Sequence, residues 1–106
     1  MRPLLTCALL LLSVCAAAAA KNTTFNNPKD RSSGLAIDEC LKPGRGGCGQ
    51  EAADKFCKDM NAGSGITFRK ARSNSNTFLQ GSRSICDVKK EHCFALTQIV
   101  CGHFTM

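Results

Sequence analysis

Six cysteines behind an apolar leader carry most of the chemistry that this sequence offers. Residues 1–20 combine one basic residue near the start, an apolar run over residues 4–12 and small residues at the end, the layout of a secretory signal peptide. Removing this leader removes Cys7 and Cys15 and leaves an even number of cysteines, which suits an oxidising compartment. The remaining six are Cys40, Cys48, Cys57, Cys86, Cys93 and Cys101. We therefore expect a secreted, extracellular protein with three disulfides.

The second candidate for chemistry is a basic segment that contains no acidic residue. No Asp or Glu occurs between Asp59 and Asp87, and four basic residues lie in that interval: Arg69, Lys70, Arg72 and Arg83. Without the leader the chain has 13 basic and 8 acidic residues, so the rest of the domain is close to neutral. A local positive cluster raises the concentration and the association rate of an anionic partner. The alternative is a solvated basic loop that serves solubility.

The residue types argue against other kinds of site. His92 and His103 are the only histidines, and no two cysteines have the close spacing of a zinc site, so we expect no metal and no other cofactor. No serine lies in a nucleophile elbow, and Asp38 and Glu39 belong to a domain too small for a substrate cleft, so we expect no enzyme activity. The sequence has no Trp or Tyr to stack on bases, which argues against nucleic-acid binding.

The elements that must position these residues belong to one small domain. We assign residues 21–34 to a flexible polar tail and residues 35–106 to the disulfide-rich domain. The apolar run of the leader is shorter than the roughly 20 residues that cross a bilayer, and no later segment replaces it, so we expect no transmembrane segment. The tail holds the only N-glycosylation sequence, which makes Asn22 the candidate glycosylation site.

The clearest element is a helix over residues 50–61. Its apolar side chains recur at helical spacing: Ala52, Ala53, Phe56, Cys57 and Met60. Charged residues occupy the opposite face, and Gly63 can end the helix in a left-handed conformation. We expect this helix to dock on a core and to be tied to a strand through Cys57.

Strands are expected on both sides of the helix. Residues 35–40 alternate weakly, and residues 84–88 and 94–101 are two further candidates. Residues 66–71 and 77–79 flank a Ser/Asn-rich turn and predict a hairpin. The order indicates an α+β fold, a small disulfide-stapled domain with one helix packed on an antiparallel sheet.

The cysteine spacing excludes two pairings. Cys48 and Cys57 would lie about 13 Å apart along a helix, and Cys93 and Cys101 about 26 Å apart along a strand. A disulfide tolerates a Cα separation of roughly 4.4–6.8 Å. Ten of the 15 pairings that six cysteines allow remain open.

The sequence CGQEAADKFC over residues 48–57, preceded by Cys40, resembles the CGQxAADxFC motif of small secreted six-cysteine proteins of plants and some bacteria. In that group a strand-rich half with three more cysteines follows the motif, and the resemblance covers residues 40–101. It implies a shared disulfide scaffold and transfers no functional residue. The chain lacks the adjacent cysteines and the Cys-x-Cys pair of plant lipid-transfer proteins, and the Cys-x3-Cys clamp of defensins.

Three functions are compatible with these observations. The first is a cationic host-defence protein with antimicrobial action, in which Arg69, Lys70, Arg72 and Arg83 on the hairpin bind an anionic surface, such as a microbial membrane or an acidic glycan. The alternative is a signalling ligand or recognition protein that docks on an acidic receptor patch. The third is an inhibitor of a secreted enzyme that inserts residues 72–76. We expect a monomer in each case.

Overall fold

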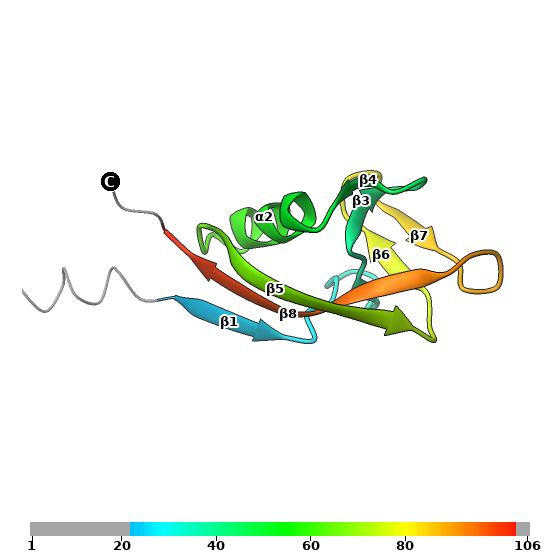
Figure 1. Cartoon of the computed structure of the whole chain (residues 1–106), viewed down its shortest axis with the longest axis horizontal. Helices are drawn as coiled ribbons and strands as arrows, with labels where there is room; N and C mark the ends of the chain where they lie inside the picture. Colours follow the sequence, from blue (N-terminus) through cyan, green and yellow to red (C-terminus); the bar gives the residue numbers. More distant parts are fainter. Residues whose placement is uncertain (1–21, 104–106) are drawn as a thin grey trace, which may run out of the picture.

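The apolar stripe that follows Cys48 folds as the helix α2, Gln50–Asp59. The computed structural model describes residues 22–103, so the leader expected over residues 1–20 lies outside the described part of the chain. The buried face of α2 is made by Ala52, Ala53, Phe56 and Cys57. One helix packed against antiparallel sheets and stapled by three disulfides makes a small α+β domain, as the sequence predicts (Figure 1).

The main sheet has the strand order β1-β8-β5 and packs against α2 (Figure 1). Its middle strand is β8, Cys93–Gly102, and both neighbours pair with it antiparallel: β5, Ser64–Ser73, and β1, Thr23–Asn26. The β5–β8 ladder shifts register between Gly65 and Thr67 and again between Arg69 and Lys70. Such irregularities bend a strand and re-aim its side chains.

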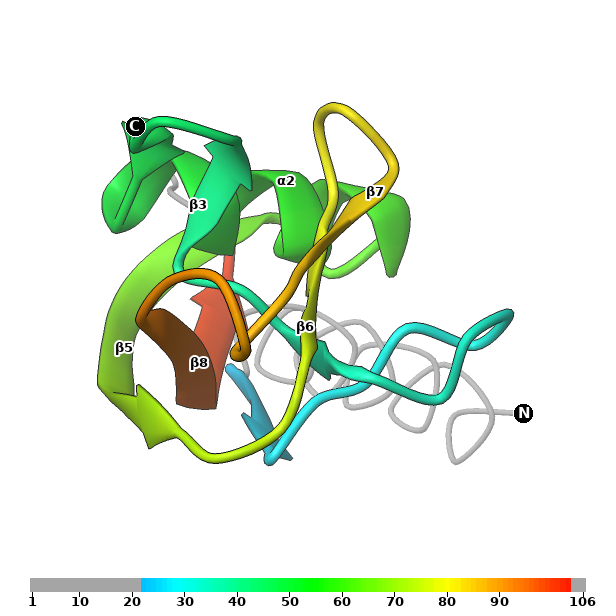
Figure 2. The ribbon, with the colours of Figure 1, turned by 90° about the vertical axis from the view of Figure 1, so that its right-hand side faces the viewer.

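Two smaller sheets complete the fold at the other end of the molecule, which faces the viewer in Figure 2. In the first, β6, Thr77–Leu79, pairs in parallel with β2, Ala36–Ile37, and antiparallel with β7, Ser84–Cys86. In the second, β3, Cys40–Lys42, and β4, Gly46–Cys48, form a hairpin.

The two residues between β2 and β3 join the sheets. The Asp38 amide donates to the Phe78 carbonyl at 2.9 Å, and the Glu39 amide donates to the Phe94 carbonyl at 2.9 Å. Because Phe78 lies in β6 and Phe94 in β8, these two bonds connect the β2-β6-β7 sheet to the main sheet.

The core lies between α2 and the inner face of the main sheet. Leu96, Ile99 and Cys101 of β8 are almost fully buried there against the helix. Phe25 of β1 meets Phe56 of α2 edge-on, with 5.1 Å between the ring centroids. A second, smaller cluster of buried side chains consists of Cys40, Leu79, Cys86 and Cys93.

The three disulfides are Cys40–Cys48, Cys57–Cys101 and Cys86–Cys93. Cys57–Cys101 ties α2 to β8, which confirms that a strand cysteine holds the helix. Cys40–Cys48 crosses the β3–β4 hairpin, and Cys86–Cys93 closes the loop between β7 and β8. Both pairings that the spacing excludes are absent from this set.

The predicted hairpin of residues 66–71 and 77–79 is wrong. Both segments are strands, but β5 pairs with β8, while β6 lies in a different sheet. All three residues of β6 are buried, and the strand pairs with β2 on one edge and with β7 on the other. Among the strands of residues 22–103, only β8 matches the ten residues of β5 in length.

The predicted flexible tail is also corrected, because residues 22–34 are built into the domain. Thr23–Asn26 pairs with β8, Pro28 is buried, and Lys29 forms an isolated bridge with Ala36. The physical reason is the contact of Phe25 with Phe56, which buries an apolar ring while its polar neighbours face solvent.

Candidate functional site

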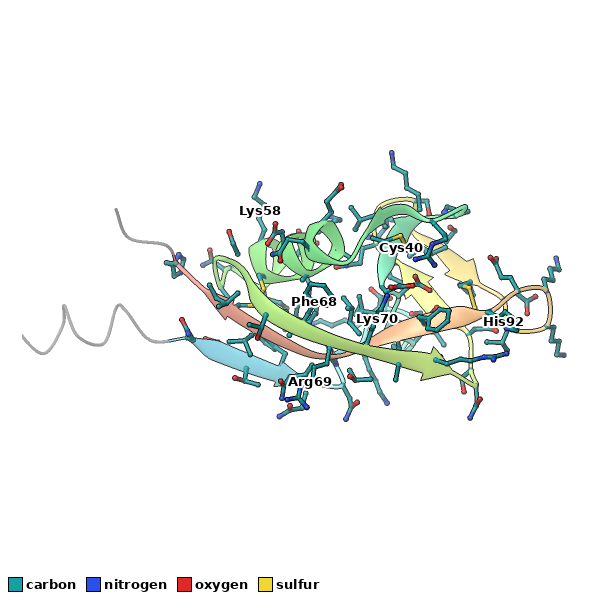
Figure 3. All side chains as sticks on the ribbon, in the orientation of Figure 1. Cys40, Lys58, Phe68, Arg69, Lys70 and His92 are labelled. Carbon is teal, nitrogen blue, oxygen red and sulfur yellow. A yellow bond between two sulfur atoms is a disulfide. The ribbon has the colours of Figure 1, made fainter. Side chains whose placement is uncertain are left out.

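The basic residues of β5 do not all point the same way. Figure 3 shows Arg69 on the face of the main sheet away from α2 and Lys70 on the face toward it. Arg69 is exposed and pairs in register with Gln98, and Lys70 points to the other face because successive side chains of a strand alternate. Arg72, two residues further along β5, is exposed and contacts Nδ1 of His92 through its guanidinium, with 2.5 Å between the nitrogens.

Lys70 is held by a buried carboxylate. Its Nζ donates to Glu39 Oε1 at 2.8 Å, and Nη1 of Arg45 donates to Glu39 Oε2 at 3.2 Å. The Glu39 side chain is only 3% exposed, whereas those of Lys70 and Arg45 are 50% and 65% exposed. The negative charge of Glu39 is therefore shared by two cations. These contacts link the β3–β4 turn, through Arg45, and β5, through Lys70, to Glu39.

Asp38, beside Glu39, is buried, and no basic side chain of residues 22–103 forms an ion pair with it. Thr77 Oγ1 donates to its Oδ2 at 2.5 Å, and the Cys40 amide donates to its Oδ1 at 2.8 Å. Burial raises the pKa of the Asp38 carboxyl, the negative charges of Glu39 and Glu91 act in the same direction, and the two hydrogen bonds only partly oppose them. The small hollow beside these carboxylates, about 40 Å³, has room for about one water molecule.

Arg83 lies on a different element from the other three predicted residues. It occupies the turn between β6 and β7 with a positive φ of 55°, and its guanidinium carbon is 5.7 Å from the centroid of the Phe78 ring. That geometry fits a cation–π contact. The structure therefore places Lys70 and Arg72 near Glu39 and His92, Arg69 on the opposite face, and Arg83 in another sheet. The expected single basic hairpin surface is not formed.

Arg83 borders a surface cleft of about 350 Å³, which we call the Arg83 cleft. Its apolar lining comes from three elements: Ile37 of β2, Phe56 of α2 and Phe78 of β6. Met60, at the end of α2, also lines it and is 38% exposed. The basic residues of its lining are Lys29, Arg31 and Arg83, and the acidic ones are Asp30 and Asp59.

Both carboxylates of the Arg83 cleft already have partners on their own segments. Asp30 Oδ2 accepts hydrogen bonds from the Ser32 hydroxyl and from the amide and hydroxyl of Ser33, each at 2.8 Å. Although desolvation acts in the opposite direction, these bonds and the charge of Arg83 lower the pKa of Asp30. Asp59 Oδ2 accepts from Lys55 Nζ at 3.0 Å. Lys29, Arg31 and Arg83 take part in no ion pair within residues 22–103.

Sequence reasoning missed Lys29 and Arg31, because their segment was assigned to a tail. The signal that could have placed them is Thr23-Thr24-Phe25, a β-branched and aromatic run that favours a strand. Nothing in the sequence says that this strand brings Arg31 to the same cleft as Arg83. That approach depends on β2 lying beside β6, a pairing of residues about 40 positions apart.

The histidines and cysteines form no metal site in residues 22–103. No group of three or more His, Cys, Asp or Glu side chains there has the geometry to hold a metal ion, and all six cysteines of that range are in disulfides. Asn22, the candidate glycosylation site, is exposed directly before β1 and lies beside Gly102.

No protein-family model, no curated protein and no solved structure matches this chain. The resemblance of residues 48–57 to small secreted six-cysteine proteins therefore stays a prediction. Between residues 22 and 103 the structure contains no helix that is long and apolar enough to cross a membrane.

Proposed function

We propose that this protein is a secreted, cationic host-defence protein that binds anionic microbial surfaces through positive charge spread over several faces of the domain. Three disulfides in so small a domain are typical of proteins that work in an oxidising, extracellular compartment, which supports secretion. The dispersal of the basic residues supports a surface-charge mechanism rather than one shaped contact.

The observation that carries the proposal is the imbalance between accessible cations and accessible carboxylates. Twelve Lys and Arg residues lie within residues 22–103, and only Arg45, Lys55 and Lys70 take part in ion pairs there. The other nine are exposed: Lys29, Arg31, Lys42, Lys58, Arg69, Arg72, Arg83, Lys89 and Lys90. Two of the eight acidic residues, Asp38 and Glu39, are buried, so the outer surface is more positive than the net charge implies.

Two exposed apolar side chains add to this surface. Ile85, two residues after Arg83, is 51% exposed, and Met60 lines the same cleft as Arg83. Apolar side chains beside cations strengthen attachment to an anionic membrane, because the chain gains burial as well as charge attraction.

Vesicle binding tests the proposal. We expect the mature, disulfide-bonded protein to bind phosphatidylglycerol vesicles at 0.01 M salt and to bind them more weakly at 0.15 M, since the Debye length falls from about 30 Å to about 8 Å. Binding to zwitterionic phosphatidylcholine vesicles should be absent at both salt concentrations. Bacterial growth inhibition should show the same salt dependence. If the protein neither binds anionic vesicles nor inhibits growth at either salt concentration, the proposal is wrong.

Two matched charge variants separate distributed charge from a defined docking face. One replaces Lys58, Arg69 and Lys89 by Gln, and the other replaces Lys42, Arg72 and Lys90 by Gln. Each removed charge is worth about 1 kcal/mol near an anionic membrane, so both variants should lose on the order of a hundredfold in affinity. If only one of them loses affinity, a shaped interface, as in the receptor-docking alternative, explains the data better.

A further inference from the structure

We propose that the Arg83 cleft binds a small organic anion with an apolar body, such as an aryl or short acyl carboxylate or sulfonate. This inference does not rest on the proposed attachment to microbial surfaces, because it concerns one hollow rather than the charge of the whole domain.

The size and lining of the Arg83 cleft suit a small ligand. Its volume of about 350 Å³ lies at the lower end of the roughly 300–1,000 Å³ typical of ligand pockets. Ile37, Phe56 and Phe78 are at most 7% exposed, so they form a packed apolar wall. Met60 is the accessible apolar residue beside them, and its flexible thioether adapts to rings and to acyl chains.

The charges at the rim select an anion. Lys29, Arg31 and Arg83 form no ion pair in the described residues, although the charge of Arg83 acts on Asp30 through space. Asp30 accepts hydrogen bonds from Ser32 and Ser33, and Asp59 accepts one from Lys55. An incoming cation would have to compete with these partners and would meet three like charges. An incoming anion meets three cations and two carboxylates, so its net interaction with the rim is attractive, and it displaces no hydrogen bond of either carboxylate.

Part of the lining that would meet the ligand is held in place before it binds. The Arg83 guanidinium is positioned over Phe78, and the Gln80 side chain in the wall is held by a hydrogen bond from its Nε2 to the Ala52 carbonyl at 3.0 Å. The Asp30 turn holds the segment that carries Lys29 and Arg31. Arg83 and Gln80 therefore lose less conformational entropy on binding a ligand than free side chains would.

Fluorescence titration of the mature protein with 1-anilinonaphthalene-8-sulfonate tests this inference. We expect saturable binding of one dye per chain, together with shifts of the Asn61 and Gln80 amide signals in NMR spectra. Arg83→Gln and Arg31→Gln should each weaken binding by about three- to tenfold, which is typical of losing one partly exposed charged contact. Octanoate or benzoate should displace the dye, and the stronger competitor tells whether an acyl or an aryl body fits better.

The matched control is Arg69→Gln, which removes one exposed, unpaired charge from the opposite face of the main sheet. It should leave the affinity for the dye unchanged. The uncharged analogue N-phenyl-1-naphthylamine should bind more weakly, and Arg83→Gln should not change its affinity. Thermal unfolding by circular dichroism verifies that each variant folds. The inference is overturned if binding does not saturate, if neither anion displaces the dye, or if Arg69→Gln weakens binding as much as Arg83→Gln.

Discussion

Asp38 and Glu39 are adjacent and almost fully buried, yet their carboxylates are stabilised in different ways. Glu39 shares its charge with Lys70 and Arg45, whereas Asp38 has hydrogen bonds from Thr77 and Cys40 and no cation. A buried carboxylate without a cation favours its protonated form, because desolvation penalises the charge. Asp38 is therefore the residue at which pH acts most directly on the fold.

The replacement Asp38→Asn tests this role through the pH dependence of stability. Burial raises the pKa of Asp38 in the folded protein above its ordinary value near 3.8. As pH rises from about 4 toward the raised pKa, the folded state keeps a proton that the unfolded chain has lost, so this group contributes less stability. We expect the free energy of unfolding of the parent protein, relative to Asp38→Asn, to fall between pH 4 and pH 7.

Urea unfolding followed by circular dichroism provides this measurement, because the chain has no Trp or Tyr. The variant keeps an acceptor for the Cys40 amide and a polar group beside Thr77, so it should fold. If the two proteins show parallel stability profiles from pH 4 to pH 7, Asp38 does not titrate as described.

At the scale of elements, the connection from α2 to β5 depends on Gly63. Its φ is +95°, and a side-chain Cβ at this position would collide with the Gly102 carbonyl of β8. Replacing Gly63 by Ala forces the backbone of β8 or of the connection to move. We expect a loss of about 2–4 kcal/mol in the free energy of unfolding, the range for strain at a special backbone conformation in contact with other backbone.

Gly34 provides the matched control. Its φ is also positive, at +74°, but a Cβ there would meet no atom within 4 Å. Gly34→Ala should therefore cost only the left-handed penalty, about 1–2 kcal/mol. Equal losses at both glycines would show that the close approach to Gly102 does not matter.

The helix could be predicted from the sequence, because its signal is local. The stripe from Ala52 to Cys57 lies within two turns, and α2 begins at the predicted residue and ends two residues earlier than expected. The strand segments 66–71 and 77–79 were also located from their β-branched and aromatic residues. The pairing of these strands could not be predicted. The choice between β6 and β8 as the partner of β5 depends on the length and burial of strands far along the chain.

The candidate site was predictable only in its composition. The acid-free interval contains cations without an ion pair in the described residues, such as Arg69 and Arg83. These residues are close in sequence, but they lie on different elements of the fold. Alternation along β5 puts Arg69 and Lys70 on opposite faces of the main sheet. Arg83 lies in the turn between two strands of another sheet. Lys70 also meets Glu39, an acidic residue 31 positions away that no local window includes.

For the whole molecule, the Cys57–Cys101 disulfide should contribute most to stability. It closes a loop with a sequence separation of 44, against 8 for Cys40–Cys48 and 7 for Cys86–Cys93. By loop-closure entropy, removing the long crosslink costs about 4 kcal/mol and removing either short one about 2.5 kcal/mol. Both cysteines of the long crosslink are also fully buried, so replacing them by Ala removes core contacts as well.

Three paired Cys→Ala variants, one for each disulfide, allow the comparison by urea unfolding. The variant without Cys57–Cys101 should unfold at the lowest urea concentration, and full reduction of the parent protein should abolish the cooperative transition at moderate temperature. If the three variants have the same midpoint, or if reduced protein unfolds cooperatively, the disulfides do not provide the main constraint on this chain.

The two short disulfides also decide what happens when the backbone is cut. Lys42 and Arg45 lie inside the loop closed by Cys40–Cys48, and Lys89 and Lys90 lie inside the loop closed by Cys86–Cys93. Exposed loop tips are preferred sites of proteolytic nicking. Within these two loops, Arg45, Lys89 and Lys90 are the sites that a protease specific for Lys and Arg would use, because Lys42 is followed by Pro43. A cut in either loop leaves both new chain ends joined through the flanking sulfur–sulfur bond. The domain can thus be nicked in its exposed basic loops without releasing a fragment.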